Sequence, residues 1–303
     1  MNVRESIVRD LLRIIIWFPF RWMIGIVPLS LAFSLYKAAG DVQFALSRGK
    51  YRLLAVNLQR RLNLDEATAA GTAKRIFENH SLDRLHIFLY PRIKAWETLA
   101  PYVKFENREV LDAALKEGKG ALLIQPHFGP VQITLLSLAL QGYKPLQIGY
   151  PSDEGLSIVG RKVAYRYRLK YEAMLPAPII PADGYLGAVY KHLVRGGVVL
   201  TTGDGAGGGV FLGEHRKFPF LGTERMIPLG PAIWSLRTGA AYLPTFIIPE
   251  TYDRFRIVFE KPIAARYGDT ERDKIDMTER FVAVAEKYIK LHPACWHFWD
   301  ELI

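Results

Sequence analysis

Short apolar runs alternate with segments of helical periodicity over the last two thirds of the chain. Two continuous apolar runs, residues 121–125 and 198–202, predict strands that are covered on both faces. Further strands are predicted at residues 102–106, 146–150, 179–180, 242–248 and 254–260, and helices at 109–116, 130–142, 156–171, 184–194, 228–238 and 271–291. Strands that alternate with helices predict an α/β fold with a mixed sheet flanked by helices.

Residues 41–100 predict a helical lead-in to this sheet. Leu46, Leu53 and Leu58, with basic residues between them, indicate a helix with one solvated, positive face, and a second helix is predicted from about residue 65 to Pro91. We therefore divide the chain into an N-terminal segment, residues 1–40, and a single α/β domain, residues 41–303.

The N-terminal segment is strongly apolar. Between residues 11 and 36 the only charges are Arg13 and Arg21, but the uncharged stretch 22–36 is too short for a hydrocarbon core of ~30 Å. A longer span includes Arg21, which has to snorkel, and Pro19 and Pro28 oppose one straight helix. The pattern predicts a membrane-embedded or re-entrant anchor at residues 1–40, with a cleaved signal peptide or a buried soluble helix as alternatives.

Composition and charge narrow the function classes. Half of the 303 residues are hydrophobic, which indicates a folded protein, and a single cysteine, Cys295, excludes a disulfide framework. The net charge is +10, and residues 1–100 hold 15 Lys and Arg against 8 Asp and Glu. This excess favours an anionic partner such as lipid headgroups, an acidic carrier protein, a phosphorylated substrate or nucleic acid, although a solvated basic surface is the alternative.

Several familiar motifs do not fit. Gly203, Gly205 and Gly208 match a dinucleotide-binding spacing, but loop and strand residues follow them where a helix is required. No hydrolase serine motif, Walker loop or nucleic-acid-binding module is recognisable, and His292 and His297 flank a proline where zinc ligands would share a helical face. We expect no nicotinamide or flavin cofactor, no metal and no nucleic acid.

Two titratable residues stand at the ends of the two buried strands. His127 follows residues 121–125, and Asp204 holds the matching place after residues 198–202. Open α/β sheets bind ligands at the carboxyl ends of their strands, and histidine suits general-base chemistry near neutral pH. A loop histidine bonded to backbone, and a structural capping role for Asp204, are the alternatives.

Four segments in order resemble the bacterial lipid A biosynthesis acyltransferases of the lysophospholipid acyltransferase-like superfamily. They are QPHFGPVQ, GGVVLTTGDGAGGG, the stretch from FPFLGTERM to LPTFI, and HPACWHFW, and the similarity covers nearly the whole chain. The resemblance implies a glycerol-phosphate-acyltransferase-like fold on the cytoplasmic face of the bacterial inner membrane, in lipopolysaccharide synthesis. It implies transfer of a fatty acyl chain from an acyl carrier protein or coenzyme A thioester, with no further cofactor, to a hydroxyl of a lipid or glycolipid.

The resemblance also suggests site residues. It places the family histidine on His127 and the strand-end aspartate on Asp204, while the family arginine falls on one of three positions, Arg161, Arg166 and Arg168. Backbone N–H groups near Gly205 suit an oxyanion or phosphate, with a flexible loop as the alternative. Arg216 and Arg225 suit an anionic acceptor, with solvated charge as the alternative.

The chain departs from the family at one important position. The family motif is a histidine, four residues and then an acid, but the acid position holds Gln132. The amide oxygen of Gln132 can accept a bond from His127 Nδ1–H without supplying charge, so another acid such as Asp204 is a candidate partner. A weak or non-catalytic lipid-binding relative, a thioester hydrolase, a transferase for another acceptor, and a helix-capping role for Gln132 remain open.

Overall fold

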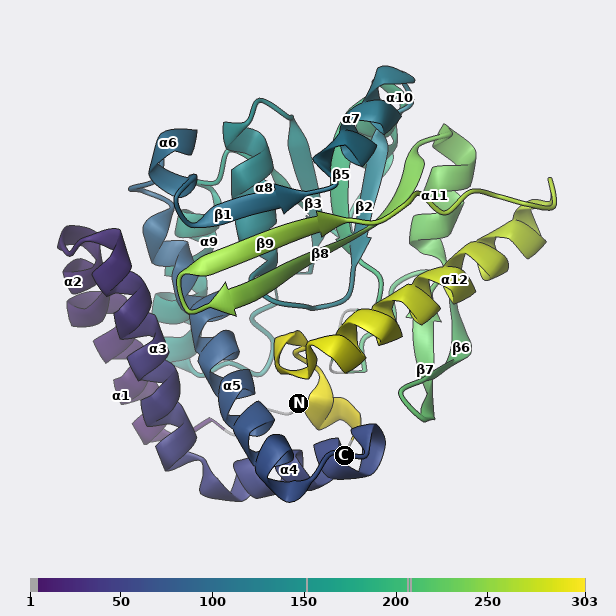
Figure 1. The fold of residues 1–303 in the computed structure, drawn as a ribbon. Helices are drawn as coiled ribbons and strands as arrows, with labels where there is room; N and C mark the ends of the chain where they lie inside the picture. The colour runs from purple at the N-terminus through teal and green to yellow at the C-terminus, as the bar shows by residue number, and fades with distance from the viewer. Residues whose placement is uncertain (1–4, 151, 206, 208, 303) are drawn as a thin grey trace.

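The computed structural model describes residues 5–150, 152–205, 207 and 209–302, and a seven-stranded sheet lies at its centre (Figure 1). The strand order is β1 (Val103–Glu106), β9 (Arg254–Phe259), β8 (Ala241–Thr251), β2 (Ala121–Gln125), β5 (Val198–Thr202), β3 (Pro145–Gly149) and β4 (Ile179–Pro181). Neighbours from β8 to β4 are parallel, whereas β9 is antiparallel to β8 and parallel to β1. The predicted α/β fold with a mixed sheet is confirmed.

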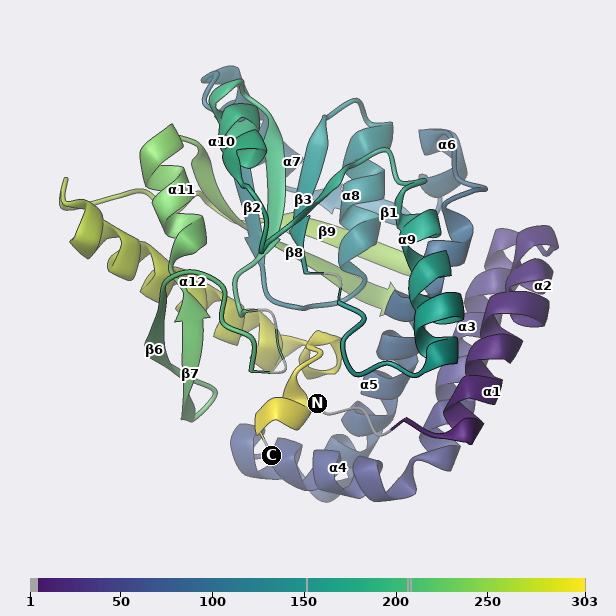
Figure 2. The same ribbon diagram turned by 180° about the vertical axis from the view of Figure 1, so that it is seen from behind.

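Both faces of the sheet are covered, which explains the continuous apolar runs of β2 and β5. In β2, Leu122 and Ile124 join a core cluster with α10 (Gly187–Val194), α11 (Gly230–Thr238) and α12 (Thr270–Leu291). Ala121 and Leu123 join the opposite cluster, with α7 (Arg108–Lys116) and α8 (Val131–Leu140), which Figure 2 shows from behind. The apolar side chains of β2 are therefore buried against helices on both faces of the sheet.

The N-terminal segment folds against the body of the protein. Its described residues form four helical elements: α1 (Ile7–Ile15), the π-helix η1 (Ile16–Phe20), α2 (Arg21–Ile26) and α3 (Leu29–Leu46). The helical lead-in to the sheet then consists of α4 (Arg48–Leu62), α5 (Glu66–Leu85), the 3₁₀ helix η2 (His86–Leu89) and α6 (Trp96–Leu99). Pro19 lies inside η1 and Pro28 separates α2 from α3, so the segment is not one straight helix. Residue 40 lies inside α3, where a Cβ on Gly40 would sit 2.6 Å from Glu78 Cα of α5.

One side of the N-terminal helices packs against the α/β domain, and the other side faces solvent. Trp17 stacks on Tyr167 with ring centroids 5.9 Å apart, and Arg13 donates to Ser157 at 3.1 Å. Exposed apolar side chains line the outer side: Ile7, Val8, Leu11, Leu12, Ile14, Ile15, Trp22, Met23, Ile26 and Leu31. Within the described ranges, none of the helices combines the length and the apolar character that crossing a bilayer requires.

Two local features differ from the predicted elements. The helix predicted at residues 156–171 is a π-helix, η3 (Gly160–Tyr165), followed by α9 (Arg166–Glu172). A hairpin of β6 (His215–Phe220) and β7 (Thr223–Pro228) stands apart from the main sheet, and β7 was not predicted. Its turn residues Leu221 and Gly222 both have positive φ, which a two-residue hairpin needs, but leucine gives no signal for such a turn.

Candidate active site

Parallel pairing of β2 and β5 brings the two candidate strand ends together. Gln125 lies opposite Thr202, so the residues that follow each strand leave the sheet at the same edge. There His127 Nδ1 lies 2.7 Å from Asp204 Oδ1, and the backbone N–H of His127 donates to Asp204 Oδ2 at 2.9 Å. The structure therefore joins the two residues that the strand-end argument selected.

Asp204 is buried, with 2% of its surface exposed, yet fully hydrogen-bonded. Besides its two bonds to His127, its Oδ2 accepts from Trp296 Nε1 at 3.0 Å, and Arg225 Nε lies 3.4 Å from its backbone oxygen. Burial alone would raise the pKa of Asp204, but the charge and bond of His127, the charge of Arg225 and the indole N–H outweigh burial and lower that pKa. Asp204 is thus a carboxylate at neutral pH.

The second ring nitrogen of His127 is directed away from this carboxylate. A proton on Nδ1 satisfies the bond to Asp204, which leaves Nε2 with a free lone pair. Nε2 bonds to no other residue of the described chain, and the His127 side chain is 27% exposed beside the ring of Phe298, at 4.3 Å between centroids. The arrangement therefore leaves His127 partly exposed, with one ring nitrogen paired to a carboxylate and the other unbonded among the described residues.

Gln132 does not occupy the place expected for a partner of His127. It lies in the first turn of α8, where its amide oxygen accepts from Tyr90 Oη and its Nε2 donates to Glu172 Oε1 at 3.3 Å. His127 Nδ1–H bonds to Asp204 where a bond to Gln132 was expected. The end of β5 places Asp204 at the histidine, while α8 directs Gln132 toward Tyr90, after η2, and Glu172 of α9. The helix-capping alternative is not realised either, because the side chain of Gln132 bonds Tyr90 and Glu172, and α8 has no side-chain cap at its N-cap residue, Pro130.

The three candidate arginines of η3 and α9 are separated by the fold. Arg161 and Arg166 are exposed, whereas Arg168 Nε donates to the buried carboxylate of Glu172 at 2.7 Å. Burial lowers the pKa of Arg168, but the paired Glu172 outweighs burial and raises it. A polar network therefore runs from Tyr90 through Gln132 and Glu172 to Arg168, and Arg168 is the arginine tied to the motif.

This network yields a prediction for an acid at the motif position. In Gln132→Glu, a second carboxylate faces Glu172 in place of an amide donor, so repulsion should cost about 1–3 kcal/mol of stability at pH 8. Repulsion raises the folded-state pKa of the new glutamate, so the cost should fall as the pH drops through that raised pKa and be absent below about pH 4, where the residue is protonated in both states. Urea unfolding measures it.

The double variant Gln132→Glu/Glu172→Gln serves as the control, because it removes the second charge. It should recover part of the stability that Gln132→Glu loses, and the cycle isolates the coupling between the two positions. A Gln132→Glu protein as stable as the wild type, with higher turnover, would show instead that position 132 acts with His127.

The glycine cluster borders a cavity next to Asp204. The cavity has a volume of about 380 Å³ and is lined in part by Asp204, Gly205 and Arg225. Gly205 has a φ of 91°, a conformation that glycine adopts without strain, while residues 206 and 208 of the cluster lie outside the described residues. The backbone of Gly205 is thus placed beside the dyad.

The two other candidate arginines have different surroundings. Arg225 Nη2 donates to Glu301 at 2.8 Å, and its guanidinium lies over the rings of Trp296 and Phe298. It is therefore already engaged by side chains of the protein, whereas Arg216 is exposed on β6. As for metals, no group of three His, Cys, Asp or Glu residues suited to an ion is found among the residues that the structure describes.

The comparisons with known proteins bear on this site. A family model described as bacterial lipid A biosynthesis acyltransferase matches residues 5–302. The chain belongs to this family. Membership extends over both strand ends and the C-terminal segment, so the protein is an acyltransferase, with His127 and Asp204 inside the matched region.

Other comparisons add little about this acyltransferase. Among curated proteins, none matches it significantly. A solved structure, the 1-acyl-sn-glycerophosphate (LPA) acyltransferase PlsC from Thermotoga maritima, aligns with a TM-score of 0.37 and 14% identity over 86% of this chain and 97% of that chain. Values this low describe a loose likeness and establish no shared substrate.

Sequence reasoning did not find three residues of this acyltransferase site. Tyr90 and Glu172 hold Gln132, and Trp296 holds Asp204. Tyr90 follows η2 and Glu172 ends α9, and neither belongs to a recognisable motif. Trp296 lies in HPACWHFW, one of the four family segments, but no spacing rule links it to residues 92 positions away.

Proposed function

We propose that this acyltransferase moves a fatty acyl chain from an acyl thioester to a hydroxyl of a lipid or glycolipid, with His127 as general base. The supporting observation is the His127–Asp204 pair at the strand ends, with Nε2 unbonded and partly exposed. The thioester of acyl carrier protein or coenzyme A is a co-substrate, and the chemistry uses no metal or other cofactor.

In this mechanism Nε2 of His127 takes the proton of the acceptor hydroxyl as its oxygen attacks the thioester carbonyl carbon. The C–S bond then breaks, and the imidazolium returns the proton to the leaving sulfur, so that ester and thiol are released. Asp204 fixes the Nδ1–H tautomer and stabilises the imidazolium, which is the part that the motif acid plays in the family pattern.

Basic side chains near the site suit anionic substrates. Arg168 pairs with Glu172 through Nε, and its side chain is still 53% exposed. Its remaining N–H groups are suited to a phosphate of the acceptor or the donor. The exposed Arg161 and Arg166 on the same segment suit an acidic carrier protein or an anionic bilayer surface.

Product analysis tests the proposal. The purified protein is incubated with radiolabelled acyl carrier protein or acyl-CoA thioesters and with lipid extracts that contain free hydroxyls. We expect label in an esterified lipid, and mass spectrometry of that product identifies the acceptor. Label only in free fatty acid would indicate a thioester hydrolase, and no turnover with any donor would indicate a non-catalytic relative.

We further propose that the N-terminal helices hold the protein on the cytoplasmic face of the bacterial inner membrane. The support is the row of exposed apolar residues on α1, α2 and α3, together with a charge of +7 over residues 1–100. Helices of this kind lie in the interface with their apolar side in the acyl chains and their basic residues near anionic headgroups.

This proposal predicts that the protein stays on membranes after a high-salt wash, because salt screens charge but leaves apolar insertion intact. Leu11→Glu, on α1, should reduce flotation with anionic vesicles severalfold. Leu291→Glu, at an exposed apolar position of α12, is the matched control and should float as the wild type does. Complete release of the wild type by salt would overturn the anchor.

A further inference from the structure

The segment that follows α12 runs alongside the loop that carries His127. Gly129 N–H donates to Cys295 O at 2.8 Å, and His297 N–H donates to His127 O at 2.9 Å. Between these two bonds, Phe128 and Trp296 form an isolated antiparallel bridge. This backbone pairing fixes Trp296 relative to His127, although the two residues are far apart in the sequence.

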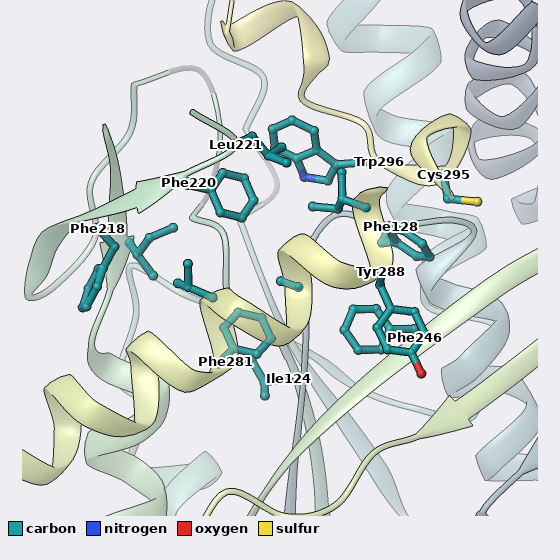
Figure 3. Packing of buried hydrophobic residues seen from close by; sticks show 14 of the residues in the cluster. Ile124, Phe128, Phe218, Phe220, Leu221, Phe246, Phe281, Tyr288, Cys295 and Trp296 are labelled. Carbon is teal, nitrogen blue, oxygen red and sulfur yellow. The ribbon is translucent and has the colours of Figure 1, made fainter. Parts of the chain in front are cut away.

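The indole of Trp296 is fixed by packing, as its backbone is fixed by hydrogen bonds. It is fully buried, with ring centroids 5.4 Å from Phe220 and 5.1 Å from Trp299, and Figure 3 shows it beside Phe220 and Leu221. The guanidinium of Arg225 covers its face at 5.5 Å. In this packing Nε1 donates to Asp204 Oδ2 at 3.0 Å.

The bond from Trp296 helps to fix the plane of the Asp204 carboxylate relative to the histidine ring. Oδ2 accepts hydrogen bonds from two N–H groups that do not titrate, the indole N–H of Trp296 and the backbone N–H of His127. The other oxygen, Oδ1, is then directed at His127 Nδ1. A partial rotation that turned the carboxylate plane away from the histidine would break both bonds to Oδ2. The same two donors stabilise the carboxylate charge inside a buried site.

We propose that Trp296 is a positioning residue of the acyl transfer: its indole N–H holds the Asp204 carboxylate so that Oδ1 faces His127 Nδ1 and Nε2 serves as the base. This role rests on the proposed function, in which His127 is the general base. It assigns to the C-terminal segment a part in the chemistry beyond packing.

Removal of the indole N–H has a specific effect on pH dependence. A carboxylate without this donor attracts the imidazolium proton more strongly, so the dyad is protonated at higher pH and the acid limb of kcat/KM moves upward. The other charged or titratable groups that act on the dyad are Arg225 with its partner Glu301, Asp83 of α5, and His297. Replacement of the indole by another aromatic ring removes none of these groups and leaves a ring under the guanidinium of Arg225.

The test compares Trp296→Phe with Trp299→Phe. Both variants keep a buried aromatic ring and lose one indole hydrogen bond, but that of Trp299 goes to Pro293 O and does not concern Asp204. We expect Trp296→Phe to lower kcat about tenfold, the typical effect of losing a hydrogen bond to a charged group, and to shift the acid limb upward. Trp299→Phe should leave both the limb and kcat near wild type. Equal behaviour of the two variants would overturn the proposal.

A second measurement keeps the proposal testable if the Trp296→Phe protein does not fold. Incorporation of β-(3-benzothienyl)alanine at position 296 replaces only the N–H by sulfur, and ¹⁵N-histidine NMR then reports the His127 tautomer. We expect Nδ1–H to dominate in the wild type and to lose its dominance in the variant; an unchanged tautomer would overturn the role of Trp296. Since this readout needs no turnover, it stays decisive even if His127→Ala keeps activity and the proposed function fails.

Discussion

His127→Ala should lower the rate of acyl transfer by about 10²–10⁴-fold, the usual contribution of a general base. The variant loses Nε2, the ring nitrogen that the proposed mechanism uses to take the hydroxyl proton, and changes no other side chain. The loss should therefore appear in kcat more than in KM. Initial rates with a labelled acyl thioester measure it.

The stability of this variant needs a companion measurement. From the sequence alone, a loop-end histidine is expected to matter little for stability, but here its removal leaves the buried Asp204 with two donors where it had three. His127→Gln keeps an amide donor in reach of Asp204 and should lose activity equally with a smaller shift in thermal transition. Wild-type turnover in a folded His127→Ala protein would remove His127 from the mechanism.

Asp204→Asn should lower turnover nearly as much as His127→Ala does. It should lower turnover more than Gln132→Glu does. The amide nitrogen of asparagine donates where the carboxylate accepted, so His127 either turns or adopts the wrong tautomer, and the imidazolium loses its counter-charge. In a serine protease triad the equivalent change costs ~10⁴-fold in turnover, which is an upper guide here. Measurement of kcat for both variants, with the same donor and acceptor, gives the ranking.

The same substitution has a signature in acid unfolding. The pKa of Asp204 lies below its ordinary value in the folded protein, so this carboxylate stabilises the fold above the unfolded-state pKa near 3.9. That contribution disappears as the pH falls through the lower, folded-state pKa. Asp204→Asn should therefore lose stability at pH 7 and show a weaker dependence on pH in the acid range. If Asp204→Asn keeps full turnover while Gln132→Glu does not, the dyad is wrong.

Local patterns were sufficient for most of the architecture. The runs of consecutive apolar residues in β2 and β5 predicted strands covered on both faces, because a strand with one solvated face would alternate apolar and polar residues from its first position. Their carboxyl ends then selected His127 and Asp204, since parallel strands end at one edge. The hairpin of β6 and β7 escaped prediction because its pairing depends on a positive φ at Leu221, which no local rule favours.

The sequence by itself thus determined the fold class, the family resemblance and the two strand-end residues that meet. Only the tertiary structure decided that Asp204, and not Gln132, bonds His127, that Gln132 joins Tyr90 and Glu172, and that Trp296 completes the site. The physical reason is that sequence patterns carry local information, while the contacts of the site are long-range. Periodicity and spacing report which residues of a single helix or strand are buried. Hydrogen-bond partners depend instead on the directions of side chains from elements that are distant in the sequence. These directions are fixed only when the helices pack on the sheet.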